Sequence, residues 1–313
     1  TTRGAEPDSP MHPRRFIRDS MLYAAGQYVY RVLLMARSLV AARVLGPQPF
    51  GDWNAIQLVM DYGLLATGGT FQGLDQVVPP RVVDGDRAEL WRVKRAGLFN
   101  VLVLSLLYAG ATLAYFTLTH GKIETAWGLR GIVVALTCVV LTNLGYYHLN
   151  LLRAHGNIPG VAAWYLLQGT VGAGLALAFL PRFGVWALLG GWLTGTAVAS
   201  IGTLLRVRKI APMRPACSSE SLHLLRIGAP MYLYSASTIL RSLDRVINLK
   251  FVGTLELGYY SLAVTAMTLL LYVPDSLSYV LYPQLLKLYR LGGERPEAIR
   301  AQVERTFRAQ AVV

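Results

Sequence analysis

The chain has 313 residues, of which 54% are hydrophobic and 15% are charged, and its mean hydropathy is +0.41. This composition leaves too little polar surface for a soluble globular protein of this length, so we expect an all-α, polytopic membrane protein. The formal net charge of +13 can also indicate nucleic-acid binding. Here the basic residues are dispersed over loops between apolar stretches, which argues against a nucleic-acid partner.

Eight apolar stretches are long enough to cross a hydrocarbon layer of about 30 Å as helices. In chain order they cover residues 20–44, 51–78, 96–119, 131–152, 159–180, 185–205, 222–251 and 255–286. The segments between them are short, so none has room for a separate catalytic domain. We therefore expect about eight transmembrane helices with the lipid bilayer as their main surroundings.

Basic residues concentrate in the N-terminal segment and in the loops at 79–95 and 206–221. The intervening loops carry few of them. By the positive-inside rule, this asymmetry places the N-terminus and the two basic loops in the cytoplasm. The sequence thus predicts a multi-pass protein of the inner, cytoplasmic membrane with a cytoplasmic N-terminus.

A sequence pattern at residues 37–53 recurs at residues 244–260. Each copy is the charged end of an apolar helix, then a hydrophobic residue and Gly, a short gap, a second Gly and the start of another apolar helix. Internal repeats of membrane helices are the usual construction of secondary transporters. The pattern therefore predicts a transporter with a first six-helix lobe and the start of a second, repeated lobe.

The repeat also sets the expected domain boundaries. We expect a cytoplasmic segment at 1–18, a six-helix transmembrane lobe at 19–208 and a cytoplasmic linker at 209–221. The first two helices of the second lobe follow at 222–286, and a basic cytoplasmic segment at 287–313 contains the start of a ninth helix. A complete second lobe would need on the order of 100 further residues, so the pattern indicates C-terminal truncation.

Two groups of residues carry a resemblance to a known family. One is Gly228, Ala229 and Pro230 with the runs 243–247 and 256–260, and the other is Leu45, Gly46 and Pro47 with Phe50 and Gly51. The first group resembles the seventh and eighth helices of polysaccharide-synthesis flippases, and the second resembles the end of their first helix. These flippases belong to the multidrug/oligosaccharidyl-lipid/polysaccharide exporter superfamily.

The resemblance implies a transporter of two helical lobes. Such proteins move an undecaprenyl-pyrophosphate-linked oligosaccharide across the cytoplasmic membrane by alternating access, for polysaccharide biosynthesis. The implied partners are this anionic lipid-linked saccharide, the bilayer, a polysaccharide polymerase and glycosyltransferases. No catalytic residue, cofactor or metal is expected, and the protein is not expected to be an enzyme.

Charged residues inside the apolar stretches are the candidate site residues, because each costs about 2.5–3.5 kcal/mol at a helix centre on insertion scales. Arg31 and Arg37 lie in the first stretch, and Arg241 and Arg245 lie in the seventh. We predict that these arginines bind substrate, since a guanidinium fork matches phosphate oxygens. The alternative is that they pair with Asp61, Asp244 or backbone carbonyls, or extend to the membrane surface.

Two further pairs of residues have predicted roles in coupling and motion. Asp61 in the second stretch and Asp244 in the seventh are candidates for ion coupling or for ion pairs with the arginines. Pro274 and Asp275 in the eighth stretch are a candidate hinge, because proline frees backbone carbonyls and kinks a helix.

Three other functions remain open at this point. A cation-coupled multidrug exporter of the same superfamily would favour a carboxylate-rich cavity, whereas the charges inside the helices are mostly arginines. A membrane partner of polysaccharide enzymes that does not itself transport is a second alternative. A membrane glycosyltransferase or polymerase is the third; its only support is the Asp84, Gly85, Asp86 turn, and such aspartates are usually just solvated.

Overall fold

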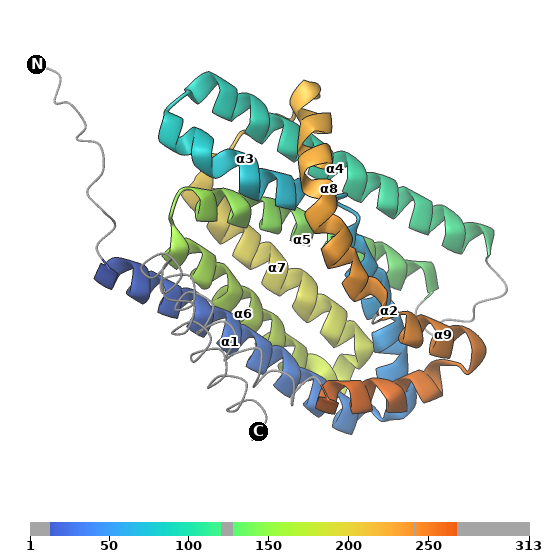
Figure 1. Cartoon of the computed structure of the whole chain (residues 1–313). Helices are drawn as coiled ribbons and strands as arrows, with labels where there is room; N and C mark the ends of the chain where they lie inside the picture. Colours follow the sequence, from blue (N-terminus) through green and yellow to red (C-terminus); the bar gives the residue numbers. More distant parts are fainter. Residues whose placement is uncertain (1–12, 120–127, 241, 268–313) are drawn as a thin grey trace, which may run out of the picture. The chain divides into compact units, whose positions relative to one another are not determined.

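The computed structural model describes residues 13–119, 128–240 and 242–267, in which every regular element is a helix. Residues 1–261 form one compact unit and residues 262–313 form another. Figure 1 labels most of the helices, whose bounds are α1 (Pro13–Leu45), α2 (Pro47–Leu65), α3 (Thr70–Asp84), α4 (Arg87–Leu118), α5 (Gly128–Ala154), α6 (Ile158–Phe183), α7 (Val185–Val207), α8 (Ser219–Leu240) and α9 (Leu243–Phe251). A further helix covers 254–267.

Four of the described helices are long and apolar enough to cross a membrane, namely α4, α5, α6 and α7. They correspond to the third to sixth predicted spans. The first predicted span, with Arg31, corresponds to α1. The second, with Asp61, corresponds to α2 and α3, and the seventh, with Asp244, corresponds to α8 and α9. The predicted all-α, polytopic membrane fold is confirmed.

The second and seventh predicted spans are each divided into two helices. Between α2 and α3, Gly68 and Gly69 have φ angles of +59° and +90°, a left-handed backbone that glycine adopts readily and that ends a right-handed helix. The seventh span is divided between Leu240, where α8 ends, and Leu243, where α9 begins. Apolar content alone predicted continuous helices here, because hydropathy does not register the backbone conformation.

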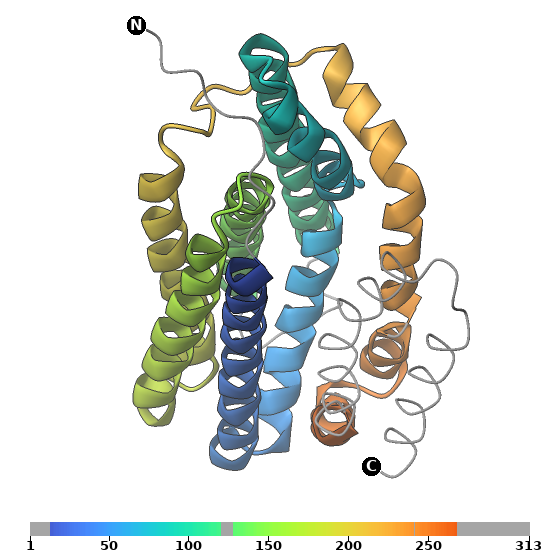
Figure 2. The same cartoon turned by 60° about the vertical axis from the view of Figure 1, so that its left-hand side comes forward.

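Helices α1 to α7 pack around two hydrophobic clusters. Helix α6 contacts both α1 and α7, and α5 contacts α2, α4 and α7; Figure 2 shows α1 beside α6. One cluster surrounds Tyr147 and Trp164, and the other surrounds Phe50, Trp53 and Leu188. Both clusters join helices that are distant in sequence, so they fix the relative positions of the helices on which polar residues lie.

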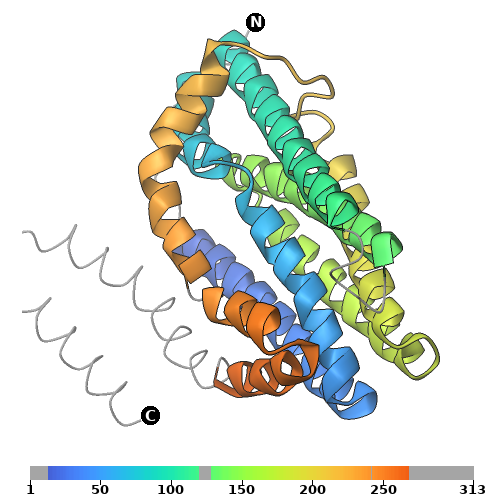
Figure 3. The ribbon, with the colours of Figure 1, turned by 90° about the vertical axis from the view of Figure 1, so that its right-hand side faces the viewer.

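Helix α8 crosses α3 at a point where the two backbones touch. A Cβ atom at Gly228 would overlap the carbonyl oxygen of Gly69, and one at Gly73 would overlap that of Leu224. Both distances would be shorter than 3.0 Å, the closest approach of real Cβ atoms to other heavy atoms. Figure 3 shows α8 beside α3 and α4. Glycine at these positions therefore permits the close approach of the two helices.

The starts of α2 and of helix 254–267 make a second close contact, and it is reciprocal. A Cβ atom at Gly51 would overlap the carbonyl oxygen of Thr254, and one at Gly258 would overlap that of Pro47. Thr254 and Gly258 stand in the second copy of the sequence pattern where Pro47 and Gly51 stand in the first. Equivalent residues of the two copies thus meet each other.

The linker between α7 and α8 is held against the polar end of α4. Lys94, whose exposed fraction is 2%, donates a hydrogen bond of 2.8 Å to the carbonyl oxygen of Ile210. The backbone N–H of Ala216 donates to the carbonyl oxygen of Arg95, and Asn100 donates from Nδ2 to the carbonyl oxygen of Ser221 at 2.8 Å. These bonds fix the linker and the start of α8 to α4.

His155, in the turn between α5 and α6, completes this attachment. Its Nδ1 lies 2.8 Å from the carbonyl oxygen of Leu151, and its Nε2 lies 3.2 Å from Nζ of Lys94. Because a carbonyl only accepts, Nδ1 carries the proton and Nε2 accepts from Lys94. Burial, together with the neighbouring Lys94 charge, lowers the pKa of His155, which favours this neutral form.

Candidate functional site

A cavity of about 180 Å³ lies between α1, α3, α5 and α6. We call it the tyrosine cavity. Its lining combines aromatic, aliphatic and polar side chains from four helices: Tyr23, Phe71, Gln72, Asp75, Tyr146, Leu149, Asn150, Arg153, Val161 and Tyr165. Pockets with an apolar lining and a few convergent polar groups are the usual form of small-molecule sites. The cavity is therefore our candidate functional site.

The aromatic side of the cavity consists of tyrosines held in place by other rings. Tyr23 and Tyr165 meet edge to face with their centroids 6.3 Å apart. Trp164 lies behind them, 5.1 Å from the Tyr165 ring and 5.3 Å from the Tyr146 ring, and its exposed fraction is only 1%. Because a buried indole supports the tyrosines, their rings present a fixed surface to the cavity.

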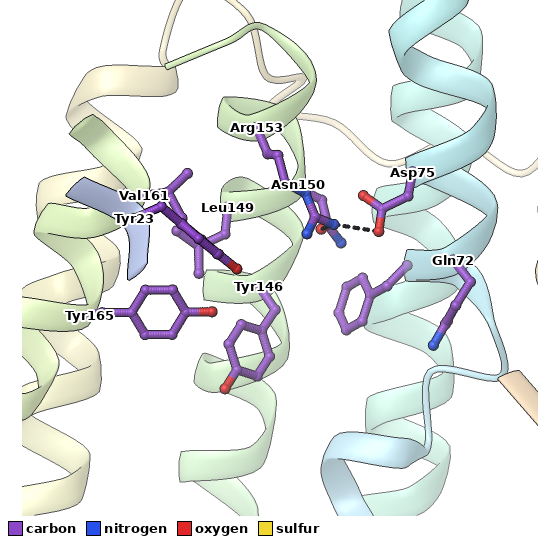
Figure 4. Close-up of a pocket in the computed structure, with 10 residues that line it drawn as sticks. Tyr23, Gln72, Asp75, Tyr146, Leu149, Asn150, Arg153, Val161 and Tyr165 are labelled. Atoms are coloured by element: carbon purple, nitrogen blue, oxygen red, sulfur yellow. Dashed lines mark hydrogen bonds and ion pairs between the residues drawn. The ribbon is translucent and has the colours of Figure 1, made fainter. Parts of the chain in front are cut away.

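The polar side of the cavity contains an ion pair. Arg153 of α5 donates from Nη2 to the Asp75 carboxylate of α3 and, at 2.9 Å, to Oδ1 of Asn150. Figure 4 shows these three side chains, with Gln72 on the same side of the cavity as Asp75. The exposed fractions of the Arg153 and Asp75 side chains are 44% and 38%. The ion pair is thus accessible and links two helices across the cavity.

This arrangement suits a ligand with an apolar face and several hydroxyl groups. Ring faces contact C–H groups, whereas carboxylate, amide and guanidinium groups offer both acceptors and donors in fixed planes. The lining contains one cationic and one anionic side chain, which are paired with each other. The formal charge of the described lining residues is therefore zero, and these residues offer no unpaired carboxylate to a metal or organic cation.

Arg37, predicted to bind substrate, is enclosed between α1, α2 and α7. Its guanidinium carbon lies 5.2 Å from the centroid of Trp53 and 5.1 Å from that of Trp192, and the residue is 2% exposed. Its Nε–H and Oε1 of Gln168 have no hydrogen-bond partner in the described structure. The cavity they share measures about 10 Å³, the size of one water molecule.

The other charged residues singled out from the sequence lie elsewhere. Arg31 is half-buried on α1 and does not line the tyrosine cavity. Asp61 of α2 interacts electrostatically with Arg245 of α9.

Asp244 accepts hydrogen bonds from the Tyr260 hydroxyl and from the backbone N–H of Arg245. The remaining predicted site residues, Arg241, Pro274 and Asp275, lie outside the described residues.

The Arg153–Asp75 pair, Tyr146 and Asn150 were not among the site residues predicted from the sequence. Asp75 gave a usable signal, because it is a carboxylate inside the second predicted span. Arg153 directly follows the end of the fourth predicted span, so it did not stand out as a charge inside an apolar stretch. Only the packing of α3 against α5 brings these two residues together.

A family model described as polysaccharide biosynthesis protein matches residues 96–313. The chain belongs to the polysaccharide biosynthesis protein family. This assignment agrees with the resemblance found in the sequence. No curated protein matches the chain.

Solved structures show that this polysaccharide biosynthesis protein has the fold of MOP-superfamily transporters. A MATE structure with bound Br-NRF superposes on 94% of the chain and 70% of its own length, with 17% identity and a TM-score of 0.61. A MOP superfamily transporter from Pyrococcus furiosus superposes on 85% of the chain and 63% of its own length, with 17% identity and a TM-score of 0.56.

A third solved chain, described only as protein A, superposes on 99% of the chain and 72% of its own length, with 15% identity and a TM-score of 0.69. The present chain thus corresponds to roughly two thirds of these structures. Family and fold together point to a transporter rather than a catalytic enzyme.

Proposed function

We propose that the protein flips a lipid-linked oligosaccharide across the cytoplasmic membrane by alternating access, as a step of polysaccharide biosynthesis. The family and the MOP-superfamily fold support the transport function. The observation that carries the substrate class is the tyrosine cavity, which combines ring faces with an Arg–Asp–Asn group. A cavity of this chemistry suits a sugar, and its place in a membrane transporter suits a sugar attached to a lipid.

In this proposal the arginines act on the phosphates of the lipid carrier. Arg31 lies on α1 and Arg245 on α9, whereas Arg241 lies outside the described residues. Guanidinium groups bind phosphate oxygens in a bidentate manner. Arg37 would reach a phosphate only after the Trp53 and Trp192 rings move apart, because both now cover it.

The acidic residues and the hinge have roles in the transport cycle. The Asp61–Arg245 interaction joins α2 to α9, so a diphosphate that pairs with Arg245 would release the Asp61 carboxylate. Asp244 is the second candidate for ion pairing or coupling, and Pro274 with Asp275 is the proposed hinge. The protein would lie in the inner membrane with its N-terminus in the cytoplasm, next to a polysaccharide polymerase and glycosyltransferases.

A cation-coupled multidrug exporter is the second candidate, because MATE structures share the fold. Cation coupling and the binding of cationic drugs both need an available carboxylate. Asp75 is paired with Arg153, and Asp61 interacts with Arg245. The Arg153–Asp75 ion pair and the electrostatic interaction of Asp61 with Arg245 favour the saccharide over the drug.

The test is mass spectrometry of undecaprenyl-pyrophosphate saccharides in cells that lack the gene. We expect a complete repeat unit to accumulate in the deletion strain, because a block in flipping follows synthesis. Expression of the wild-type protein in the deletion strain should abolish this accumulation, and expression of the Arg31→Ala variant should not. The matched control is Arg43→Ala, an exposed arginine at the end of the same helix.

Unchanged lipid levels in the deletion strain would refute the flippase function. If these cells instead became sensitive to cationic dyes, the multidrug exporter would replace it.

A further inference from the structure

We propose that the tyrosine cavity binds one uncharged sugar residue of the transported saccharide and that the diphosphate binds elsewhere. The proposal rests on the proposed function for the identity of the transported molecule, but the binding itself can be measured without transport. Three properties of the cavity carry it: charge, size and the arrangement of its ring faces and polar groups.

The charge of the lining excludes a diphosphate. Among the described residues, Arg153 is the one cationic side chain that lines the cavity, and it is already paired with Asp75 and bonded to Asn150. An incoming diphosphate would compete with the Asp75 carboxylate and be repelled by it, since like charges a few ångströms apart disfavour each other. A neutral hydroxyl meets no such penalty, because it can donate to Asp75 and accept from Arg153 without breaking the pair.

The size of the cavity fits one sugar ring. Sites for drug-sized ligands usually measure about 300–1,000 Å³, whereas this cavity measures about 180 Å³. It can accept a single hexose and not a chain of several. The remaining sugars and the lipid would therefore extend out of the cavity.

The geometry matches the two kinds of surface that a pyranose has. The C–H groups on one face of the sugar would lie against Tyr23 and Tyr165, whose rings are set at 78° to each other. Hydroxyl groups on the ring edge would meet Asp75, Asn150 and Arg153. An alkyl chain would displace water from these polar groups without offering them a hydrogen bond in return, which costs free energy. A lipid tail is therefore a poor occupant.

Saturation-transfer difference NMR on the purified full chain in nanodiscs tests the proposal directly. The probes are free glucose, galactose, N-acetylglucosamine and glucuronate, with inorganic pyrophosphate as competitor. We expect saturation of at least one neutral sugar, no competition by pyrophosphate, and weaker binding of glucuronate. If no neutral sugar is saturated, or if pyrophosphate displaces the sugar, the proposal is wrong.

Two variants on one helix locate the sugar. Tyr23→Leu removes a ring that lines the cavity, whereas Tyr28→Leu removes a ring on α1 that is 55% exposed. We expect Tyr23→Leu to weaken sugar binding about fivefold to tenfold, the usual effect of losing an aromatic contact, and Tyr28→Leu to leave it unchanged. Equal thermal midpoints for the two variants will exclude misfolding, and equal sugar binding would refute the location.

Asp75→Asn should reverse the preference of the cavity for neutral over anionic sugars. It leaves Arg153 without its carboxylate, so the cavity gains a net positive charge. We expect glucuronate to bind more tightly than glucose in this variant, the reverse of the wild-type order. An unchanged order would refute the charge argument.

The outcomes also separate this proposal from the proposed function. Sugar binding that depends on Tyr23, combined with normal lipid levels in the deletion strain, would retain the sugar site and remove the flippase function. If saccharide accumulates in that strain but the Tyr23→Leu and Tyr28→Leu variants bind sugar equally well, the flippase function is supported and the sugar site is refuted.

Discussion

The crossing of α3 and α8 predicts that one added methyl group will separate two helices. Gly228→Ala places a Cβ atom against the carbonyl oxygen of Gly69, which is backbone and cannot rotate away. The two backbones would have to separate by a distance on the order of 1 Å to relieve the overlap. Such overpacking usually costs about 1–3 kcal/mol.

The same Gly→Ala substitution should stabilise the protein at a helical glycine that has free space around it. Gly174 lies in α6, and a Cβ atom there would meet nothing within 4 Å. Alanine in place of glycine within a helix is favourable by roughly 0.5–1 kcal/mol, because it restricts the unfolded chain. Gly174→Ala is therefore a matched control that carries the identical chemical change without the contact.

The assay is the thermal midpoint of purified protein in one detergent at one heating rate, because membrane proteins unfold irreversibly and the midpoint depends on the rate. With about 2–4 °C per kcal/mol, we expect Gly228→Ala to lower the midpoint by roughly 2–12 °C and Gly174→Ala to leave it unchanged or raise it slightly. If both variants behave alike, α3 and α8 do not touch as described.

Three further predictions concern the buried cations and the linker. The free energy of unfolding of Arg37→Met should stay within about 1 kcal/mol of wild type, because a hydrophobic side chain of similar size avoids burying a charge. Arg37→Ala should lower it by about 2–5 kcal/mol, because of the cavity it leaves. Thermal midpoints in detergent distinguish the two variants. Lys94→Met leaves the Ile210 carbonyl without its donor, so trypsin should cut the linker faster than in the exposed control Arg92→Met. Because the folded pKa of His155 is lowered from 6.5, its stabilising contribution is present above pH 6.5 and is lost as pH falls; His155→Gln should remove this part of the pH dependence of the thermal midpoint.

The helical membrane fold was predictable because each residue contributes to membrane insertion nearly independently. The spans that became α4 to α7 consist almost entirely of apolar residues, so summing their hydropathy finds them. The charged residues of the first, second and seventh spans were also visible, since an isolated charge in an apolar run stands out. The family resemblance rested on short Gly and apolar patterns, and the family model confirmed it.

The helix breaks in the second and seventh predicted spans were not predictable from summed hydropathy. Gly68 and Gly69 are adjacent glycines in an apolar run, and such glycines often continue a membrane helix as packing surfaces. Only the contact of α3 with α8 at Gly69 and Gly228 explains why the backbone turns there.

The sequence by itself determined that this chain is an all-helical membrane protein of a polysaccharide biosynthesis family, because composition and short patterns act locally along the chain. The tertiary structure alone decided that Arg153 pairs with Asp75 beside Tyr23, and that Arg37 lies enclosed between Trp53 and Trp192. Those contacts join residues from different helices. Which faces of the helices meet depends on the packing of the whole bundle, and no local pattern encodes it.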